Sequence, residues 1–180
     1  MIEFDINKLR KSCREVLPEE VESVTQQLEA ELAQHPTGIG LAANQIGLDV
    51  KVAVIRIPDK EKIDLINPKI IDYSKEIVFY QESCLSLPDL KKPVTTQRYR
   101  EITIENGFDK GKYVLYGMEA IACQHEIDHL NGLLITDRQA KPYTRPSRKI
   151  GRNERCATCN VKYKRHDGVE HGFVVKGELK

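Results

Sequence analysis

The apolar residues of this chain change spacing along its length, and each spacing predicts one kind of element. Helical spacing over residues 18–34 predicts a helix that ends before Pro36. A second helix is predicted from about Met118 to the pair Asn131 and Gly132, a common helix end. β-Branched and aromatic residues predict extended segments between these helices: 51–57, 64–71, 76–88, and a hairpin of 100–106 and 112–117.

Consecutive strands followed by a helix differ from the regular strand–helix alternation of a parallel sheet. We therefore expect an α+β fold in which mostly antiparallel strands pack around the helix that begins at Met118. Pro68 interrupts segment 64–71, because proline has no N–H for a sheet ladder. After Asp137 apolar residues become rare, which predicts a linker. The chain thus divides into a body, residues 1–140, and a tail, residues 141–180.

The charge of the chain is divided unevenly between body and tail. The tail holds 11 Lys and Arg against 4 Asp and Glu, whereas the body holds 17 against 23, for a net charge of +1. A basic tail on an acidic body indicates contact with RNA, the ribosome or an acidic protein. The alternative is a solvated tail without a partner.

The length of 180 residues suits one domain with a small appendage. No apolar run approaches the ~20 residues that span a bilayer. The first residues lack the apolar centre of a signal peptide. We therefore expect a cytoplasmic monomer without membrane contact, whose five cysteines are reduced and free to bind metal.

Residues 125–129, His-Glu-Ile-Asp-His, place an H-E-x-x-H motif in the second predicted helix. Residues four apart share a helix face, so His125 and His129 can reach one metal ion. Glu126 lies beside them, where it can accept a proton from a water molecule on the ion. The alternative is two surface histidines that share a face by chance. In a chain with five histidines, this spacing around a glutamate favours the metal site.

A catalytic metal usually has three protein ligands and one open position. Asp137 follows the motif too closely to fold back onto it easily. Cys84, in the extended segment before Pro88, is another candidate, and its thiolate with two imidazoles would leave a divalent ion with one net positive charge. The same cysteine equally fits a buried small apolar side chain, the commonest role of a free thiol. The residues by themselves leave both alternatives open.

Three segments together closely resemble the signature motifs of the peptide deformylase family: GIGLAANQ at 38–45, ESCLS at 82–86 and HEIDH at 125–129. The resemblance covers about residues 1–140. Ser83 departs from the glycine usual in the family and would crowd the turn before Cys84, and the tail does not show the long C-terminal helix of many relatives. The resemblance implies a metal-dependent hydrolase that removes the N-formyl group from the N-terminal methionine of nascent proteins and releases formate.

The resemblance also implies roles for single residues. Cys84 would join the two motif histidines as a metal ligand, and Glu126 would carry the proton of water to the departing amine. The Gln45 side-chain amide and the Leu85 backbone N–H would donate to the developing oxyanion. Without the resemblance, Gln45 would be assigned as a surface amide that caps the preceding turn.

A substrate pocket is expected beside the metal. It would be formed by apolar positions on the helix face of the two histidines, by two family pocket positions and by glycines that let a peptide approach as an added strand: Met118, Ile121, Ala122, Ile39, Tyr80, Gly38 and Gly40. The opposite helix face, with Cys123, Ile127 and Leu130, should enter the core. Without a metal, such an apolar stripe would itself be assigned to the core.

The resemblance implies ferrous iron as the working ion, with nickel or cobalt as active substitutes and zinc as a poor one. Thiolate and imidazole ligands by themselves favour zinc. The resemblance also predicts an ion pair between Glu82 and Arg98 that orients the metal ligands.

The tail has a second candidate metal site. Cys156 and Cys159 are followed by His166 and His171, a set that can hold a structural zinc ion. The segment partly resembles the short SEC-C zinc motif, whose ligand spacing differs. The alternative is a disordered tail in which these residues are incidental.

Two rival functions follow from the same residues. An H-E-x-x-H zinc metallopeptidase would cut internal peptide bonds and would not need Cys84. A non-catalytic binding module would act through its tail and would not need Glu126. Release of formate from a formyl-methionine peptide distinguishes all three.

Overall fold

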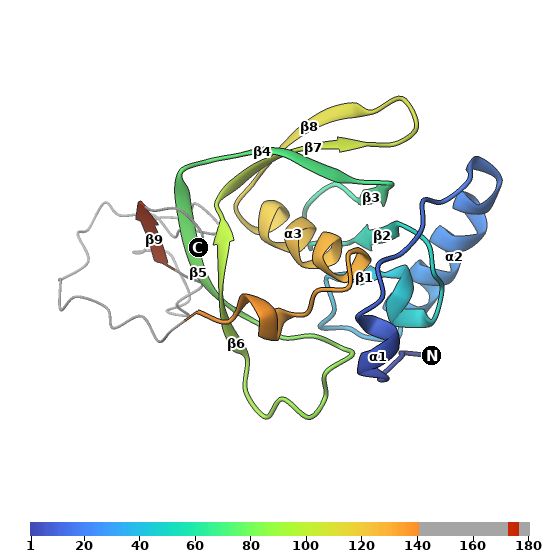
Figure 1. Ribbon diagram of the computed structural model, residues 1–180, viewed down its shortest axis with the longest axis horizontal. Helices are drawn as coiled ribbons and strands as arrows, with labels where there is room; N and C mark the ends of the chain where they lie inside the picture. The colour runs from blue at the N-terminus through green and yellow to red at the C-terminus, as the bar shows by residue number, and fades with distance from the viewer. Residues whose placement is uncertain (141–172, 177–180) are drawn as a thin grey trace.

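The computed structural model describes residues 1–140 and the backbone of residues 173–176 (Figure 1). The helices in these ranges are α1 (Ile6–Leu9), η1 (Pro18–Glu20), α2 (Val21–Leu32), η2 (Ala43–Ile46), α3 (Met118–Leu130) and η3 (Ile135–Arg138), where η marks a 3₁₀ helix. The strands are β1 (Gly40–Ala42), β2 (Val52–Ile55), β3 (Ile63–Ile66), β4 (Lys69–Tyr73), β5 (Glu76–Glu82), β6 (Val94–Tyr99), β7 (Glu101–Asn106), β8 (Gly111–Tyr116) and β9 (Phe173–Lys176).

The strands form three sheets of three strands each, in the orders β1-β2-β3, β4-β7-β8 and β6-β5-β9. Every pairing between these strands is antiparallel. The predicted hairpin is present as β7 and β8, with Glu101 opposite Tyr116 and Asn106 opposite Gly111. The prediction of an α+β fold with antiparallel strands is confirmed.

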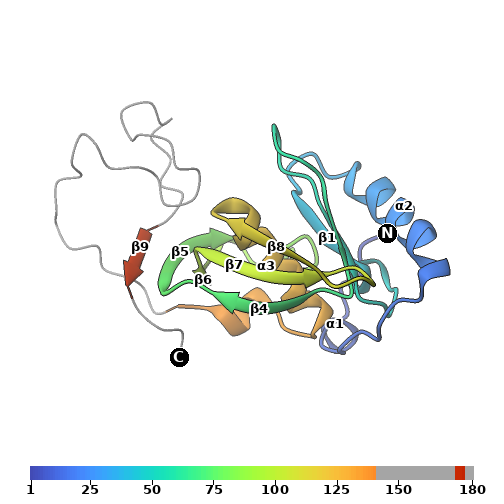
Figure 2. The same ribbon diagram turned by 90° about the horizontal axis from the view of Figure 1, so that it is seen from above.

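The sheet β1-β2-β3 lies between α2 and α3 (Figures 1 and 2). Side chains alternate between its two faces, as the pleat of a strand requires. One set packs in the cluster that contains Leu28 and Leu32 of α2: Leu41, Val52 and Val54. The other set packs in the cluster that contains Cys123 and Ile127 of α3: Ala42, Ala53 and Ile55. Burial on both faces explains why β2 is apolar at all four positions.

Helix α3 is enclosed by all three sheets, and ten of its 13 residues are buried. Ile102 and Ile104 of β7 join the same cluster from the second sheet, and Val78 of β5 packs against Ile121 from the third. The helix face predicted to enter the core does so: Cys123, Ile127 and Leu130. Close packing on all sides restricts the conformations of the side chains of α3.

Segment 64–71, predicted as one interrupted strand, is two strands in two different sheets. The chain turns at Asn67, whose φ of 47° is positive, and Pro68 follows. The Asn67 side chain accepts a hydrogen bond from the N–H of Val16 at 2.8 Å and donates to its carbonyl at 3.1 Å. A tertiary contact therefore fixes the break between β3 and β4.

Segment 76–88, predicted as extended throughout, is a strand only as far as Glu82, and a turn at Leu85 and Ser86 follows. Strand β6 was not predicted. Its inward positions are Val94, Thr96 and Arg98, and two of these three are polar. The alternation of apolar and polar residues that identifies a half-buried strand is therefore missing from its sequence.

Within the tail, the structure describes the strand β9, which pairs with β5 so that Phe173 lies opposite Phe79. The sequence analysis predicted no strand in this segment. The four candidate ligands of the tail zinc site lie outside the described residues: Cys156, Cys159, His166 and His171. Among the residues that the structure describes, no helix has the length and apolar character needed to cross a membrane.

Candidate metal centre and active site

Three side chains from two segments meet at the C-terminal half of α3. The helix places His125 and His129 one turn apart, with ring centroids 4.9 Å from each other. The segment after β5 brings Cys84 to them, with its Sγ 3.2 Å from His129 Nε2. One ligand atom from each of the three residues lies within 4.8 Å of the other two. One thiolate and two imidazoles form a donor set that fits a divalent transition metal.

The Nδ1 atom of His125, which faces away from Cys84 and His129, forms a hydrogen bond with Glu82. Its Nδ1 lies 2.6 Å from Oε2 of Glu82, a carboxylate that is itself 4% exposed. A carboxylate at Nδ1 places the proton on that atom and leaves Nε2 free for a metal. The ring of His125 is therefore oriented toward the side on which Cys84 and His129 lie.

The pKa values of the two histidines are shifted in opposite directions. Burial and the neighbouring His125 lower the pKa of His129 well below its ordinary value, so this ring is neutral. Burial also lowers the pKa of His125, but contacts with Cys84 and Glu82 prevail and raise it well above the ordinary value. A neutral imidazole is the form that binds a metal, and His129 has that form without any ion.

Glu126 is a buried carboxyl group that forms no salt bridge within the part of the chain that the structure describes. It is 4% exposed, and its Oε2 has no hydrogen-bond partner within the described residues. Burial raises its pKa to about 7. A carboxyl group with a pKa near neutrality, beside three candidate ligands, has the properties of a general acid and base.

Gln45 lies in η2, directly after β1, and is 2% exposed. Its Oε1 accepts a hydrogen bond from the N–H of Ala42 at 2.9 Å, so the amide caps the turn as one reading of the sequence predicted. The amide is buried rather than at the surface, and its Nε2 donates to Ser86 Oγ at 3.2 Å and lies 3.6 Å from Cys84 Sγ. The same side chain thus fixes the turn and directs a donor at the candidate ligands.

A cavity of about 470 Å³ opens beside these residues. Its wall includes Leu85 and every residue expected in the pocket: Met118, Ile121, Ala122, Ile39, Tyr80, Gly38 and Gly40. Ile57 and Pro58, which the sequence analysis did not single out, complete the apolar part of the wall. They follow β2 in a loop, where no periodic pattern marks them.

Ser83 lines the same cavity and is exposed. Its φ is not positive, in contrast to Asp59, Asn67 and Lys110. The backbone at this position therefore accepts a side chain without the strain that would require glycine. The departure from the family leaves Cys84 close to His129.

Glu82 and Arg98 form a buried, bidentate ion pair. Arg98 donates from Nε to Oε1 at 2.6 Å and from Nη2 to Oε2 at 3.0 Å, and the two side chains are 2% and 4% exposed. Burial raises the pKa of Glu82, but the contacts with His125 and Arg98 outweigh it and hold the pKa well below its ordinary value. Glu82 is therefore a carboxylate at neutral pH.

The sequence analysis did not assign a role to Asn44, which connects two of the three motifs. Its side chain is 7% exposed and donates from Nδ2 to the carbonyls of His129 at 2.6 Å and Leu9 at 3.3 Å. These bonds join η2 to the end of α3 and to α1. Its place inside GIGLAANQ was the available signal, because the motif match covers Asn44 as well as Gln45.

Comparisons with known proteins agree with this geometry. A family model described as polypeptide deformylase matches residues 1–145. The peptide deformylase of Desulforudis audaxviator is 37% identical over 135 residues, which cover 70% of this chain and 86% of that protein. The peptide deformylase of Thermosynechococcus vestitus is 34% identical over 141 residues, which cover 76% of this chain and 65% of that protein.

A search of solved structures gives the same result. The crystal structure of peptide deformylase from Thermotoga maritima matches with a TM-score of 0.67 and 31% sequence identity, over 78% of this chain and 97% of that one. The fold, the family model and the curated relatives are therefore consistent with one another. This chain belongs to the polypeptide deformylase family, whose metal-dependent members remove the N-formyl group from nascent proteins.

Proposed function

We propose that this chain hydrolyses the N-formyl group on the N-terminal methionine of nascent proteins, at the site formed by Cys84, His125, His129 and Glu126. One observation carries the proposal. The three candidate ligand atoms lie within 4.8 Å of one another, and Cys84 and His125 line a cavity whose wall also includes the buried carboxyl group of Glu126. A metal site, a proton carrier and a space for substrate are thus adjacent.

Cys84, His125 and His129 would hold the ion, so α3 would be the central metal-binding helix around which the strands pack. When bound, the ion would polarise the formyl carbonyl and make a water molecule acidic enough to attack it near neutral pH. We propose ferrous iron as the working ion, with Co²⁺ or Ni²⁺ as active substitutes and Zn²⁺ as a poor one.

Glu126 moves the proton in this scheme. Its carboxylate accepts a proton from the water that attacks the formyl carbon, and it then gives that proton to the amine nitrogen as the C–N bond breaks. The products are formate and a peptide with a free N-terminal methionine. In the metal-free protein the pKa of this carboxyl group is about 7, and a group in this role must both accept and return a proton near neutral pH.

Gln45 and Leu85 would stabilise the negative charge that develops on the formyl oxygen. The Nε2 of Gln45 is directed at the metal ligands by its bonds to Ala42 and Ser86. Leu85 lines the cavity in the turn that follows Cys84, and its backbone N–H would be the second donor. Donors that are fixed before the reaction stabilise the oxyanion without reorganisation.

The methionine side chain would occupy the apolar part of the cavity, between Ile39, Tyr80 and the face of α3. Met118, Ile121 and Ala122 line this part. An unbranched apolar side chain fits a wall of this composition, and the adjacent strand β1 offers a backbone edge for the peptide.

The remaining expectations stay part of the proposal. Residues 1–140 would be the catalytic domain, acting in the cytoplasm as a monomer where nascent chains emerge. Residues 141–180 would be a basic appendage that contacts the ribosome or RNA and holds a structural zinc ion. Metal analysis tests the zinc site: a second equivalent of metal should disappear when Cys156 and Cys159 are both replaced by serine.

Release of formate from a formyl-Met-Ala-Ser peptide tests the proposed reaction. The metal-free protein should be inactive, and reconstitution with Fe²⁺ or Co²⁺ under exclusion of oxygen should restore activity. Cys84→Ala should lose both activity and tightly bound metal. Cleavage of an internal peptide bond without formate release, with Cys84→Ala still active, would establish a metallopeptidase instead.

A further inference from the structure

The Glu82–Arg98 pair is part of a larger network of charged side chains that ends at Arg138. Arg98 uses its remaining nitrogen, Nη1, to donate to Asp128 Oδ2 at 2.5 Å. Arg138 in η3 donates from Nε to the same Oδ2 at 2.9 Å and from Nη2 to Oδ1 at 2.7 Å. The network therefore runs from Arg138 through Asp128, Arg98 and Glu82 to Nδ1 of His125.

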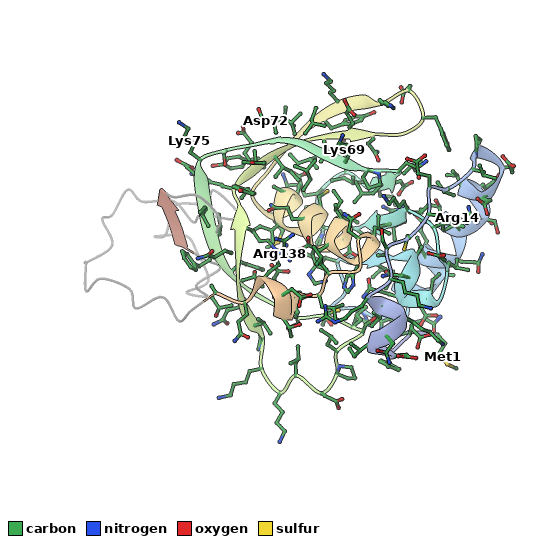
Figure 3. The ribbon with its side chains drawn as sticks, in the orientation of Figure 1. Met1, Arg14, Lys69, Asp72, Lys75 and Arg138 are labelled. Atoms are coloured by element: carbon green, nitrogen blue, oxygen red, sulfur yellow. The ribbon has the colours of Figure 1, made fainter. Side chains whose placement is uncertain are left out.

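This network of charged side chains connects four elements, η3, α3, β6 and β5, and its members range from exposed to buried. The side chains of Arg98, Glu82 and Asp128 are 2%, 4% and 9% exposed, whereas that of Arg138 is 40% exposed. Figure 3 shows Arg138 beside α3. Its own helix η3 is held in place at its end, because Gln139 pairs with Thr96 of β6 and the N–H of Ala140 donates to the Thr95 carbonyl at 2.8 Å.

Two arginines alternate with the two carboxylates along this network. Arg98 lies between Glu82 and Asp128 and contacts both, so its single positive charge cannot neutralise the pair alone. Arg138 supplies the second positive charge, and its two bonds occupy both oxygens of Asp128. Without Arg138, a buried carboxylate would compete with Glu82 for the Arg98 guanidinium, because a buried charge that loses one partner is strongly destabilised.

We propose that Arg138 is a positioning residue for the metal-ligating His125, acting through Asp128, Arg98 and Glu82. By neutralising Asp128, it leaves the guanidinium of Arg98 available to hold Glu82, and Glu82 in turn sets the ring orientation of His125 at 2.6 Å. Groups that orient metal ligands typically affect metal affinity or activity by 10–100-fold when they are replaced. The inference rests on the proposed metal site at Cys84, His125 and His129.

The alternative is a purely structural role for Arg138. The protein contains a second arginine–carboxylate pair that serves as a matched control. Arg10 forms a bidentate pair with Asp137, also in η3, with distances of 2.9 and 3.0 Å and a side chain 43% exposed. Asp137 has no bond to Arg98 among the described contacts. Arg10→Gln therefore removes an arginine–carboxylate pair from the same helix but leaves intact the network of charged side chains that ends at His125.

The experiment compares Arg138→Gln, Arg138→Lys and Arg10→Gln in the full-length protein loaded with Co²⁺. It measures the rate of cobalt loss to a chelator, the visible absorption of the bound cobalt, kcat and KM for formyl-Met-Ala-Ser, and the melting temperature. Arg138→Gln should lose cobalt roughly 10-fold faster or more, shift the cobalt absorption, and lower kcat more than it raises KM. Arg138→Lys should fall between this variant and the wild type, because an ammonium group cannot bind both oxygens of Asp128 in the same geometry.

Arg10→Gln should keep the wild-type cobalt loss and absorption even if its melting temperature falls as far as that of Arg138→Gln. Wild-type cobalt loss and absorption in Arg138→Gln, or equal changes in Arg10→Gln, would overturn the inference. If Arg138→Gln does not fold, Arg138→Lys decides, since wild-type metal retention in that variant refutes the role and faster loss supports it. Cobalt loss is measured without substrate, so a wild-type protein that binds cobalt but releases no formate would refute the proposed reaction and not this inference.

Discussion

Gly40 and Glu126 approach so closely that no side chain fits between them. A Cβ built on Gly40 would overlap the Oε1 atom of Glu126 and lie 2.9 Å from its Cδ. Both residues line the cavity, one from β1 and one from α3. The sequence analysis explained this glycine by the approach of a peptide backbone, whereas the structure shows that the carboxyl group of Glu126 already requires the space.

Gly40→Ala should therefore reduce activity strongly without removing the metal. The added methyl group displaces the carboxylate from its position, and loss of a positioned general base costs roughly 10²–10⁴-fold in rate. Formate release and metal content measured on the same sample test this expectation. Gly111→Ala is the control, because the atoms nearest to a Cβ there belong to the Tyr113 side chain, at 3.1 Å, and the variant should leave the rate unchanged. Full activity in Gly40→Ala would mean that Glu126 can move aside without consequence.

The elements that the sequence predicted best are those whose buried positions are all apolar. Segment 51–57 contains β2, whose four residues are all buried and apolar, and its core role is therefore visible in its composition. The predicted helix 18–34 contains α2, where Val24, Leu28 and Leu32 are the buried positions at helical spacing. In both cases local preference and tertiary burial agree.

Strand β6 shows why other elements were missed. Its buried positions include Thr96 and Arg98, whose partner is a carboxylate that the chain brings from β5. A polar side chain at an inward position makes the segment look like an exposed loop to any method that counts apolar residues. The motifs identified the three candidate metal ligands and also contain Asp128. Arg138 lies outside them and carries no local signal, because its role depends on a contact between α3 and η3.

Replacements of Gln45 should separate its two roles. Gln45→Met removes both the acceptor for Ala42 and the donor near Cys84, and should lower both the melting temperature and the rate. Gln45→Glu keeps an acceptor for Ala42 but removes the donor, so its rate should fall by a comparable factor, roughly 10²–10³-fold for one lost oxyanion donor. Steady-state rates and thermal unfolding of both variants test this. A Gln45→Glu protein with the wild-type rate would assign the side chain to the turn alone.

The described cysteines should differ sharply in reactivity. Cys84 is partly exposed, whereas Cys13 and Cys123 are buried. Burial raises the pKa of Cys13 to about 11, so its thiol stays protonated and unreactive at pH 8. Iodoacetamide should therefore modify Cys84 in the metal-free protein and spare the two buried thiols, and bound Co²⁺ should protect Cys84. Peptide mapping by mass spectrometry measures each site, and modification of Cys84 at the same rate with and without cobalt would contradict its assignment as a ligand.

Glu126 should make the metal-free protein less stable as pH rises. Its pKa is about 7 in the folded state and near 4.5 when exposed, so the folded protein holds a proton that the unfolded chain has already lost. Stability is then complete below about pH 4.5 and falls as pH rises through 7, by about 3 kcal/mol for a shift of this size. Glu126→Gln removes the titrating group, so the variant should lack this decline and be more stable than the wild type at pH 8 but not at pH 4.

Urea unfolding of metal-free wild-type and Glu126→Gln protein at pH 4, 6 and 8 measures the contribution of Glu126 together with its coupling to His125, because titrating groups that do not interact with Glu126 act on both proteins alike. The same variant should lose roughly 10²–10⁴-fold in the rate of formate release when loaded with metal. Higher stability at pH 8 together with lower activity is the combination expected of a buried carboxyl group kept for chemistry. Equal pH dependence of stability in the two proteins would show that Glu126 is solvated in the folded state and that its burial does not set its pKa.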